Sequence, residues 1–291
     1  MSKICVLGLG GNSVFLSVDH FHGEGETVSA HKLFTEPGGK GYNQAVAAAR
    51  LGGEVSFIGA FGKDGTSAEC ISYLNNEGIT PLIAYKEEPC AYACILTDKF
   101  GSNRVTVYRG ATDLLTAEDI AAFEERIRNG AVLVLQNEVP AEANRAAARI
   151  AKKHGVTILV NPAPAVGMDA EVLSMADIVT PNEHEAVYLY GTDYRKGISD
   201  SGIRLAAVTL GADGADVYCD GKWTRMPPYK VEAEDTTGAG DCFTGALACW
   251  IAGGGAFIKG CDFAMHAAAL AVSKPHAVEA MPYSREIFNK K

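Results

Sequence analysis

The sequence lacks several features that would place it in large classes of proteins. No apolar run approaches the roughly 18 residues that a membrane-spanning helix needs. The first residues, MSKICVLGLGG, predict a buried strand and a glycine turn rather than a signal peptide. Basic residues are in deficit, since 26 Lys and Arg stand against 35 Asp and Glu and give a net charge of −9. This balance argues against nucleic acid or an anionic membrane as a partner, and we expect a cytoplasmic protein.

Paired cysteines are missing too. The eight cysteines include no CxxC pair, and the nearest two, Cys90 and Cys94, have no second cluster to complete a metal site. Low-complexity segments and solenoid repeats are also absent. The favoured interpretation is that the cysteines are small buried hydrophobes in a reducing compartment.

The sequence does contain the pattern of an α/β protein. Hydrophobic residues make up 47% of the chain and charged residues 21%, as in a globule with a sizeable core. Short apolar runs alternate with helical stretches, and the runs are KICVLGLG, VSFIGAFG, AVLVLQNEV, TILVNPA, DIVTPNE and AAVTLGADG. Continuous apolar strands separated by helices indicate a parallel sheet flanked by helices on both faces. Ligands of such sheets bind beyond the carboxyl ends of the strands.

Two segments, 14–34 and 91–109, break this pattern. They alternate apolar and polar residues, as half-exposed antiparallel strands do. We therefore predict a single α/β domain over residues 1–291, with a small protruding β-sheet lid built from these segments. A lid suits an enzyme that excludes water from its chemistry. Its open edge strands also favour a homodimer formed through the lids.

The strongest candidate site is EDTTGAGDCFTG, residues 234–245. Gly238, Ala239 and Gly240 are expected to expose consecutive backbone N–H groups at the start of a helix, which is an anion-binding arrangement. Asp241 follows at the same position, where a helix N-terminus stabilises a carboxylate as the anion. This suits a base that accepts a hydroxyl proton while the N–H groups stabilise a phosphoryl group in transfer. The alternative, a plain helix cap, does not need three small residues before it.

Residues 38–41, GGKG, form a second candidate at the start of another predicted helix. The glycines allow close approach of a ligand to the backbone. Lys40 and Asn43 then offer donors near the helix N-terminus. The segment lacks the spacing of a P-loop, so taken alone it is weak evidence for a binding site.

Polar residues also follow two of the predicted strands. Asn182 and Glu185 lie one helical turn apart, either as a helix cap or as groups that hold hydrated Mg²⁺ and a phosphate. Thr209, Gly211 and Gly214 end a later strand, either as a loop beneath nucleotide phosphates or as an ordinary turn.

Taken together, these segments resemble the ribokinase-like (PfkB) carbohydrate kinases. GGKGYNQAVAAARLG followed by FIGAFGKDG is similar to the N-terminal signature of that family, and DTTGAGDCFTGAL to its C-terminal signature. GEGETV, LQNEVP, VNPAPA and TPNEHEA fall in the expected order, so the resemblance covers nearly the whole chain. GGKGYNQAVAAARLG and NPAPA are closest to the ribokinases. The resemblance implies ATP-dependent phosphorylation of a small sugar, with ribose as the leading acceptor.

The resemblance also implies residue roles. Asp241 is the expected base, and Gly238, Ala239 and Gly240 the expected anion hole. The cofactors implied are ATP and Mg²⁺. The implied ligand contacts are Asn182 and Glu185 for Mg²⁺ and the triphosphate (Glu185 through water), Thr209, Gly211 and Gly214 for the nucleotide phosphates, His266 for adenine, Gly39, Lys40, Asn43 and Glu138 for the sugar, and Asp235 and Thr237 for a monovalent cation.

One departure from the family bears on the acceptor. The Asn-x-Asp pair that follows the first strand in ribokinases is Gly11-Asn12-Ser13 here, so the sugar-side candidates Gly11 and Ser13 supply no carboxylate. Losing a charged hydrogen bond typically costs about 1.5–3 kcal/mol, which is enough to change substrate preference.

A second departure bears on the monovalent cation. Pro275 and His276 alter the loop near the end of the chain, and Ala280 stands where a Ser or Asn often completes the site. Activation by K⁺ therefore stays open.

Other functions remain open on the same fold. A nucleoside kinase needs an aromatic or apolar slot, for which Tyr92 or Tyr108 is available. A sugar-phosphate kinase needs extra cations, and Arg104 and Arg109 are the candidates. A non-catalytic sugar-binding regulator is disfavoured, because such a protein has no physical need for both the base and the metal-ordering residues.

Overall fold

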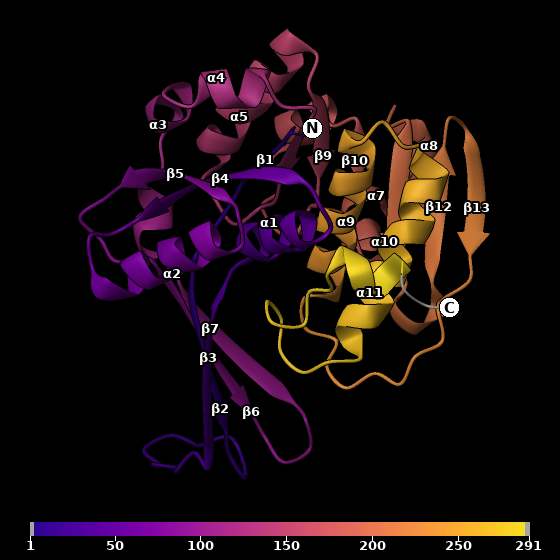
Figure 1. The fold of residues 1–291 in the computed structure, drawn as a ribbon. Coiled ribbons are helices and arrows are strands. Elements are labelled where there is room, and N and C mark those ends of the chain that lie inside the picture. The colour runs from indigo at the N-terminus through magenta and orange to yellow at the C-terminus, as the bar shows by residue number, and fades with distance from the viewer. Residues whose placement is uncertain (1–2, 289–291) are drawn as a thin grey trace.

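The apolar runs of the sequence form the strands of one large sheet. In the computed structural model, which describes residues 3–288, its strands are β1 (Lys3–Leu7), β4 (Glu54–Phe61), β5 (Thr80–Tyr85), β8 (Val132–Leu135), β9 (Thr157–Val160), β10 (Ile178–Val179), β11 (Leu205–Thr209), β12 (Ala215–Cys219) and β13 (Lys222–Met226). Their order is β13-β12-β11-β10-β9-β8-β1-β4-β5 (Figure 1). The pairs from β5 to β11 are parallel, in agreement with the predicted parallel sheet. Three strands were not predicted, namely β5, which pairs in parallel with β4, and the antiparallel hairpin of β12 and β13.

Alternate residues of the central strands divide the core between the two faces of this sheet. Ile4 and Val6 of β1 belong to one apolar cluster, and Cys5 and Leu7 to the other. The helices that contribute to the first cluster are α1 (Lys40–Arg50), α2 (Gly65–Asn76), α9 (Ala239–Ala252), α10 (Phe257–Val272) and α11 (Ser284–Phe288). Those of the second are α3 (Ala117–Ala121), α4 (Glu124–Arg128), α5 (Ala141–His154), α6 (Ala170–Met175), α7 (Glu183–Tyr190) and α8 (Tyr194–Asp200). The prediction of a sheet buried on both faces is confirmed.

A four-stranded sheet projects from this body (Figure 1). Its strands are β2 (Gly11–Ser17), β3 (Lys32–Gly38), β6 (Ala91–Thr97) and β7 (Asn103–Tyr108), in the order β3-β2-β6-β7. The strands extend further toward the body than the segments 14–34 and 91–109 suggest, because β2 begins at Gly11 and β3 continues to Gly38. These two glycines pair with each other, and a side chain at Gly11 would collide with the backbone of Ala91. Glycine here marks close packing of strands rather than a turn.

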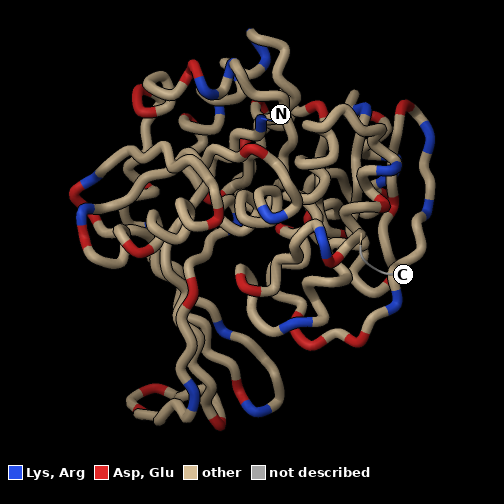
Figure 2. The backbone as a smooth tube through the Cα atoms, viewed as in Figure 1, with Lys and Arg blue, Asp and Glu red and all other residues tan. Residues whose placement is uncertain are grey.

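The surface carries charges of both signs. Lys and Arg are interspersed with Asp and Glu over the body and the lid (Figure 2). Across residues 3–288, none of the helices has both the length and the apolar character needed to cross a bilayer.

Candidate active site

A cavity of about 550 Å³ lies between the lid sheet and the body. Its wall joins residues that are far apart in the sequence: Ser13 of β2, Gly39 and Asn43 at the start of α1, and Asp235 and Thr237 just before α9. Candidates for sugar binding and for cation binding therefore face one space.

Asp241 lies in the first turn of α9 and is only 7% exposed. Its Oδ2 accepts a hydrogen bond from Asn43 Nδ2 at 2.8 Å, and its Oδ1 accepts one from Gln44 Nε2 at 3.0 Å. The residue at the N-cap is Gly238, whose φ of 75° is in the left-handed region. The carboxylate of Asp241 is thus held by α1 and does not cap its own helix, so the capping interpretation is excluded.

Gln44 was not among the predicted site residues. It is fully buried, and its amide is fixed from both ends, because Gln136 Nε2 donates to its Oε1 at 2.6 Å and its Nε2 also reaches Asn161 Oδ1 at 3.1 Å. This network orients the carboxylate of Asp241. The sequence held one signal for Gln44. It lies next to Asn43 in an alanine-rich helix, and buried polar side chains need hydrogen-bond partners.

Lys40 lies among three carboxylates. The charge of Asp241 raises the pKa of the Lys40 ammonium most, and Glu138 and Glu185 raise it further. Burial raises the pKa of Asp241 above its ordinary value, and Lys40, Asn43 and Gln44 offset this only in part. This is the reverse of the expected stabilisation of the anion at a helix N-terminus. A base with a raised pKa accepts a proton more readily, so the shift suits the expected role.

Glu138 joins this cluster from the segment that follows β8. Its Oε2 accepts a hydrogen bond from the backbone N–H of Lys40 at 2.8 Å, and burial raises its pKa. The guanidinium of Arg109 contacts the Glu138 carbonyl and pairs with Asp113 at 2.9 Å, while that of Arg104 lies 4.4 Å from the centre of the Phe21 ring. Arg109 therefore lies beside the site but is already paired with Asp113 and Glu138, and Arg104 lies against Phe21.

The start of α9 offers open donors beside Asp241. The N–H of Ala239 donates to the carbonyl of Thr236 at 3.3 Å. Within residues 3–288, the N–H groups of Gly238, Gly240 and Asp241 donate to no protein acceptor. These three groups are the donors that an anion would find at this turn, whereas the predicted donor Ala239 is already bonded.

Asn182 and Glu185 form a capping box at the start of α7. Asn182 Oδ1 accepts from the N–H of Glu185, and Glu185 Oε2 accepts from the N–H of Asn182, both at 2.8 Å. Capping uses one oxygen of Glu185, so Oε1 keeps its acceptor capacity, and burial raises the pKa of Glu185. No cluster of three His, Cys, Asp or Glu within residues 3–288 has the arrangement of a metal site. The free oxygen of Glu185 still fits hydrated Mg²⁺, which needs only one or two protein carboxylates.

The remaining nucleotide-side candidates lie along the neighbouring strand ends. Thr209 bridges in parallel to Asn182, so the two loops are adjacent. Gly214 has a φ of 87°, and a side chain there would collide with the carbonyl of Met226. The ring of His266 on α10 stacks on Tyr229, with centroids 4.7 Å apart.

The lid cavity has an aromatic wall that the sequence did not predict. Phe15 and Phe34 line it from the lid, and His276 lines it from the body. The rings of Phe34 and His276 stack with centroids 3.6 Å apart. Tyr108, one of the expected aromatic candidates, instead donates its hydroxyl to Glu88 on the exposed side of the lid.

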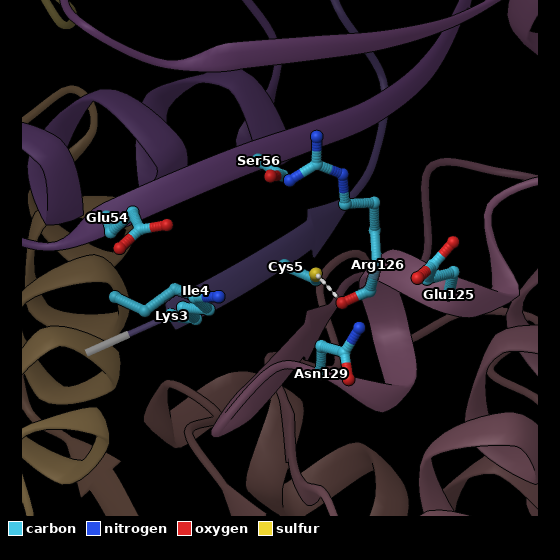
Figure 3. A pocket seen from close by; sticks show the side chains of 8 residues that line it. All are labelled: Lys3, Ile4, Cys5, Glu54, Ser56, Glu125, Arg126 and Asn129. Carbon is cyan, nitrogen blue, oxygen red and sulfur yellow. Dashed lines mark hydrogen bonds between the residues drawn. The ribbon is translucent and has the colours of Figure 1, made fainter. Parts of the chain in front are cut away.

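A second, smaller cavity of about 230 Å³ lies at the amino ends of β1 and β4 (Figure 3). Lys3, Glu54 and Arg126 line it, and the thiol of Cys5 donates to the carbonyl of Arg126 at 3.2 Å. None of the candidate residues is among its lining. Ligands of parallel sheets bind at the carboxyl ends of the strands, so the lid cavity is the candidate active site.

Comparison with known proteins gives one consistent result. The pfkB family of carbohydrate kinases matches residues 1–283. The chain is 35% identical to a ribokinase from Haemophilus influenzae over 294 residues, covering 97% of this chain and 96% of the relative. Among solved structures, ribokinase from Thermotoga maritima superposes with a TM-score of 0.89 and 32% identity over 98% of this chain and 97% of its own. Arabidopsis thaliana ribokinase complexed with ribose and ATP has a TM-score of 0.88 and 27% identity, covering 98% of this chain and 97% of its own.

Proposed function

The chain belongs to the pfkB family of carbohydrate kinases and is an ATP-dependent sugar kinase, and from that premise we propose that ribose is its acceptor. The proposal is supported by the ribokinases among its relatives and by a ribokinase neighbour solved with ribose and ATP. It also assigns the candidate site residues to the roles that the family resemblance implies.

The buried Asp241 carboxylate, held by Asn43 and Gln44, is the observation that carries the site assignment. A hydroxyl placed beside this carboxylate loses its proton to Asp241 as the γ-phosphoryl group is transferred. Lys40 and the open N–H groups at the start of α9 stabilise the negative charge that accumulates there. Asn43 and Glu138 keep the acceptor in position, which supplies much of the rate.

Mg²⁺ neutralises the charge of the ATP phosphates when bound, as in other phosphoryl transfers. Glu185 would hold its water shell through the oxygen that capping leaves available. Asn182, Thr209 and Gly214 would line the phosphates, and His266 would lie at the adenine.

A screen of acceptors tests the proposal. ATP consumption is measured with free pentoses and hexoses, nucleosides and sugar phosphates, and we expect the highest kcat/KM with ribose. Asp241→Asn should lower kcat by at least 100-fold while the affinity for ATP changes little, because the amide cannot accept the proton. Near-normal turnover in this variant would remove Asp241 as the base. A preference for another acceptor class would overturn the assignment to ribose.

One observation favours a nucleoside as the second candidate acceptor. The cavity is large for a pentose, and Phe15, Phe34 and His276 supply the aromatic wall that a base would need. Phe34→Ala separates the two acceptors. It should raise the KM for a nucleoside at least 10-fold, since base stacking contributes about 1–3 kcal/mol, and change the KM for ribose less.

We extend the proposal to the monovalent cation. The carboxylate of Asp235 accepts hydrogen bonds from the N–H groups of Thr237 and His276. These bonds tie the loop after α10 to the start of α9. Ala280 supplies no side-chain oxygen, so we expect K⁺ to change kcat by less than 3-fold. Assays in potassium and in tetramethylammonium buffers measure this directly.

We also propose a homodimer through the lid. The edge strand β7 is exposed along its whole length and carries Val105 and Val107, both more than half exposed. Unpaired edge strands with apolar side chains pair readily with a second copy. Sedimentation velocity should show a dimer that Val107→Lys shifts toward monomer.

A further inference from the structure

Glu36 is a buried carboxylate that the proposed mechanism leaves without a role. It lies on lid strand β3, is 3% exposed, and lines the active-site cavity. Its two oxygens accept the backbone N–H groups of Ala277, Val278 and Glu279, at 2.9, 3.1 and 3.3 Å. One side chain of the lid therefore binds three consecutive N–H groups of the body.

The segment that Glu36 binds is held from its other side by a cation. Arg50, at the end of α1, donates to the carbonyl oxygens of Val278, Glu279 and Met281 at 2.9, 3.3 and 2.9 Å. The N–H groups of residues 277–279 thus point to a carboxylate, and the neighbouring carbonyls point to a guanidinium. Such charge-assisted hydrogen bonds are stronger than neutral ones.

The same segment packs behind the anion-binding turn. A methyl group added to Gly238 would lie 3.3 Å from Cβ of Ala277 and 3.2 Å from Cε of Met281. The N–H of His276 donates to Asp235 Oδ2 at 3.2 Å, three residues before Gly238. Movement of residues 276–281 would therefore displace the turn that precedes Asp241.

On the acceptor side, Glu36 lies just before the glycine loop. Strand β3 ends at Gly38, and Gly39 and Lys40 follow at the start of α1. Phe34, two residues earlier on the same face of β3, stacks on His276 and strengthens the contact. Glu36 thus connects the loop that approaches the acceptor to the segment that supports the anion-binding turn.

We propose that Glu36 is a positioning residue, which sets the distance between acceptor and phosphoryl donor by fixing lid strand β3 to residues 277–279. It acts through Gly39 and Lys40 on one side and through Gly238 on the other. The reaction it serves rests on the proposed function. A displacement near 1 Å costs about 100-fold in rate, so loss of Glu36 affects kcat.

Glu36→Ala tests the proposal with whichever sugar the wild-type protein phosphorylates. We expect kcat to fall by about 10–100-fold, with the KM values for ATP and sugar within about 3-fold of wild type. The side chain borders an open cavity, so acetate or formate should occupy the vacated space, bind the three N–H groups, and restore part of kcat. Glu36→Gln, which keeps the shape and one acceptor oxygen, should lose less activity than Glu36→Ala and serves if the alanine variant fails to fold.

The control is Asp177→Ala. Asp177 also accepts a backbone N–H, that of Ile158 at 2.8 Å, but it lies at the amino ends of β9 and β10, remote from the lid. This variant should keep wild-type kcat and show no response to acetate. Wild-type kcat in Glu36→Ala, or a loss that follows only the unfolded fraction and does not respond to acetate, would overturn the proposal.

Amide hydrogen exchange separates this proposal from the assignment of the acceptor. The amides of residues 277–279 should exchange at least 10-fold faster in Glu36→Ala than in wild type, whatever the acceptor is. Unchanged exchange would show that Glu36 does not fix these residues to β3. If ribose fails as acceptor while these amides respond, only the acceptor assignment is wrong.

Discussion

At the scale of single residues, two opposing effects set the pKa of Asp241: burial raises it, and the charge of Lys40 lowers it. Burial favours the neutral form of Asp241, and Lys40 is the charge that opposes this most strongly. Asp241 must be ionised to accept a proton, so activity is present above its raised pKa and is lost as the pH falls through it. The acid limb of the rate profile should therefore lie above the range of an ordinary aspartate.

Lys40→Met should move that limb to higher pH. Without the ammonium, burial of Asp241 is less opposed and its pKa rises further. We expect a shift of about one pH unit or more in the acid limb of kcat, together with lower kcat. Lys40→Arg should keep the limb near its wild-type position. Lys63→Met removes an exposed lysine that pairs with Glu87 and should leave the profile unchanged. An unshifted limb in Lys40→Met would show that Lys40 does not lower the pKa of Asp241.

The identity of residue 13 is connected to Glu36. The two lie directly opposite each other in the register of β2 and β3, and like charges at such positions are destabilising. Ser13→Asp should therefore impair the wild-type protein. In Glu36→Gln the same change should raise kcat/KM for ribose about 10-fold or more, since a charged hydrogen bond to a hydroxyl contributes about 1.5–3 kcal/mol. The four proteins form a double-mutant cycle, and equal effects of Ser13→Asp in both backgrounds would show that the two positions are independent.

The sequence predicted the residues whose spacing follows a local rule. Asp241 after its glycine turn, and Asn182 with Glu185, stand out because helix starts have recognisable chemistry. Gln44 and Glu36 do not, because their partners lie 197 and more than 240 positions away in the chain. Glu36 was also assigned to no strand, because the expected lid segment ended at residue 34.

At the scale of elements, α1 connects separate parts of the site. Its first turn carries Lys40 and Asn43, and its last residue is Arg50. The guanidinium of Arg50 donates to carbonyl groups of the loop after α10 and pairs with Glu77 at 2.6 Å. This pair is largely buried, with side chains 5% and 13% exposed. Each end of α1 thus fixes a different part of the active site.

Glu77→Ala should destabilise the protein by about 2–4 kcal/mol, because it leaves a buried guanidinium with only neutral partners. Glu87→Ala removes the partner of Lys63 in a pair whose side chains are 68% and 91% exposed, and should cost less than about 1 kcal/mol. Urea unfolding measures both free energies. Equal values for the two variants would show that burial of the Arg50 pair does not matter.

The predicted elements of the body agree with the structure better than those of its edges. Apolar runs such as VLVL of β8 and TILV of β9 are rich in β-branched residues and too short for a helix, so they favour strands buried on both faces. Strands β5, β12 and β13 were missed, because each is a short segment that mixes polar and apolar residues as loops do. In the lid, the strands end where their pairing ends. That pairing joins segments far apart in the sequence, so a local pattern does not show where a strand stops.

At the scale of the whole molecule, the body and the lid differ in what holds them. Two apolar clusters cover both faces of the main sheet, so its central strands should open only in global unfolding. Strand β3 is attached to the body through Glu36 and Phe34. Strand β7 is exposed throughout and forms the outer edge of the small sheet.

Amide hydrogen exchange should therefore show three levels of protection. Strands β1 and β8 should exchange with the global free energy of unfolding, about 5–15 kcal/mol. Strand β3 should be intermediate, and β7 should open several kcal/mol more easily, because few buried contacts hold it. If the lids pair in a dimer, protection of β7 should rise with protein concentration while that of β1 stays constant. Protection of β7 equal to that of β1 at every concentration would mean that the lid and the body unfold as one unit.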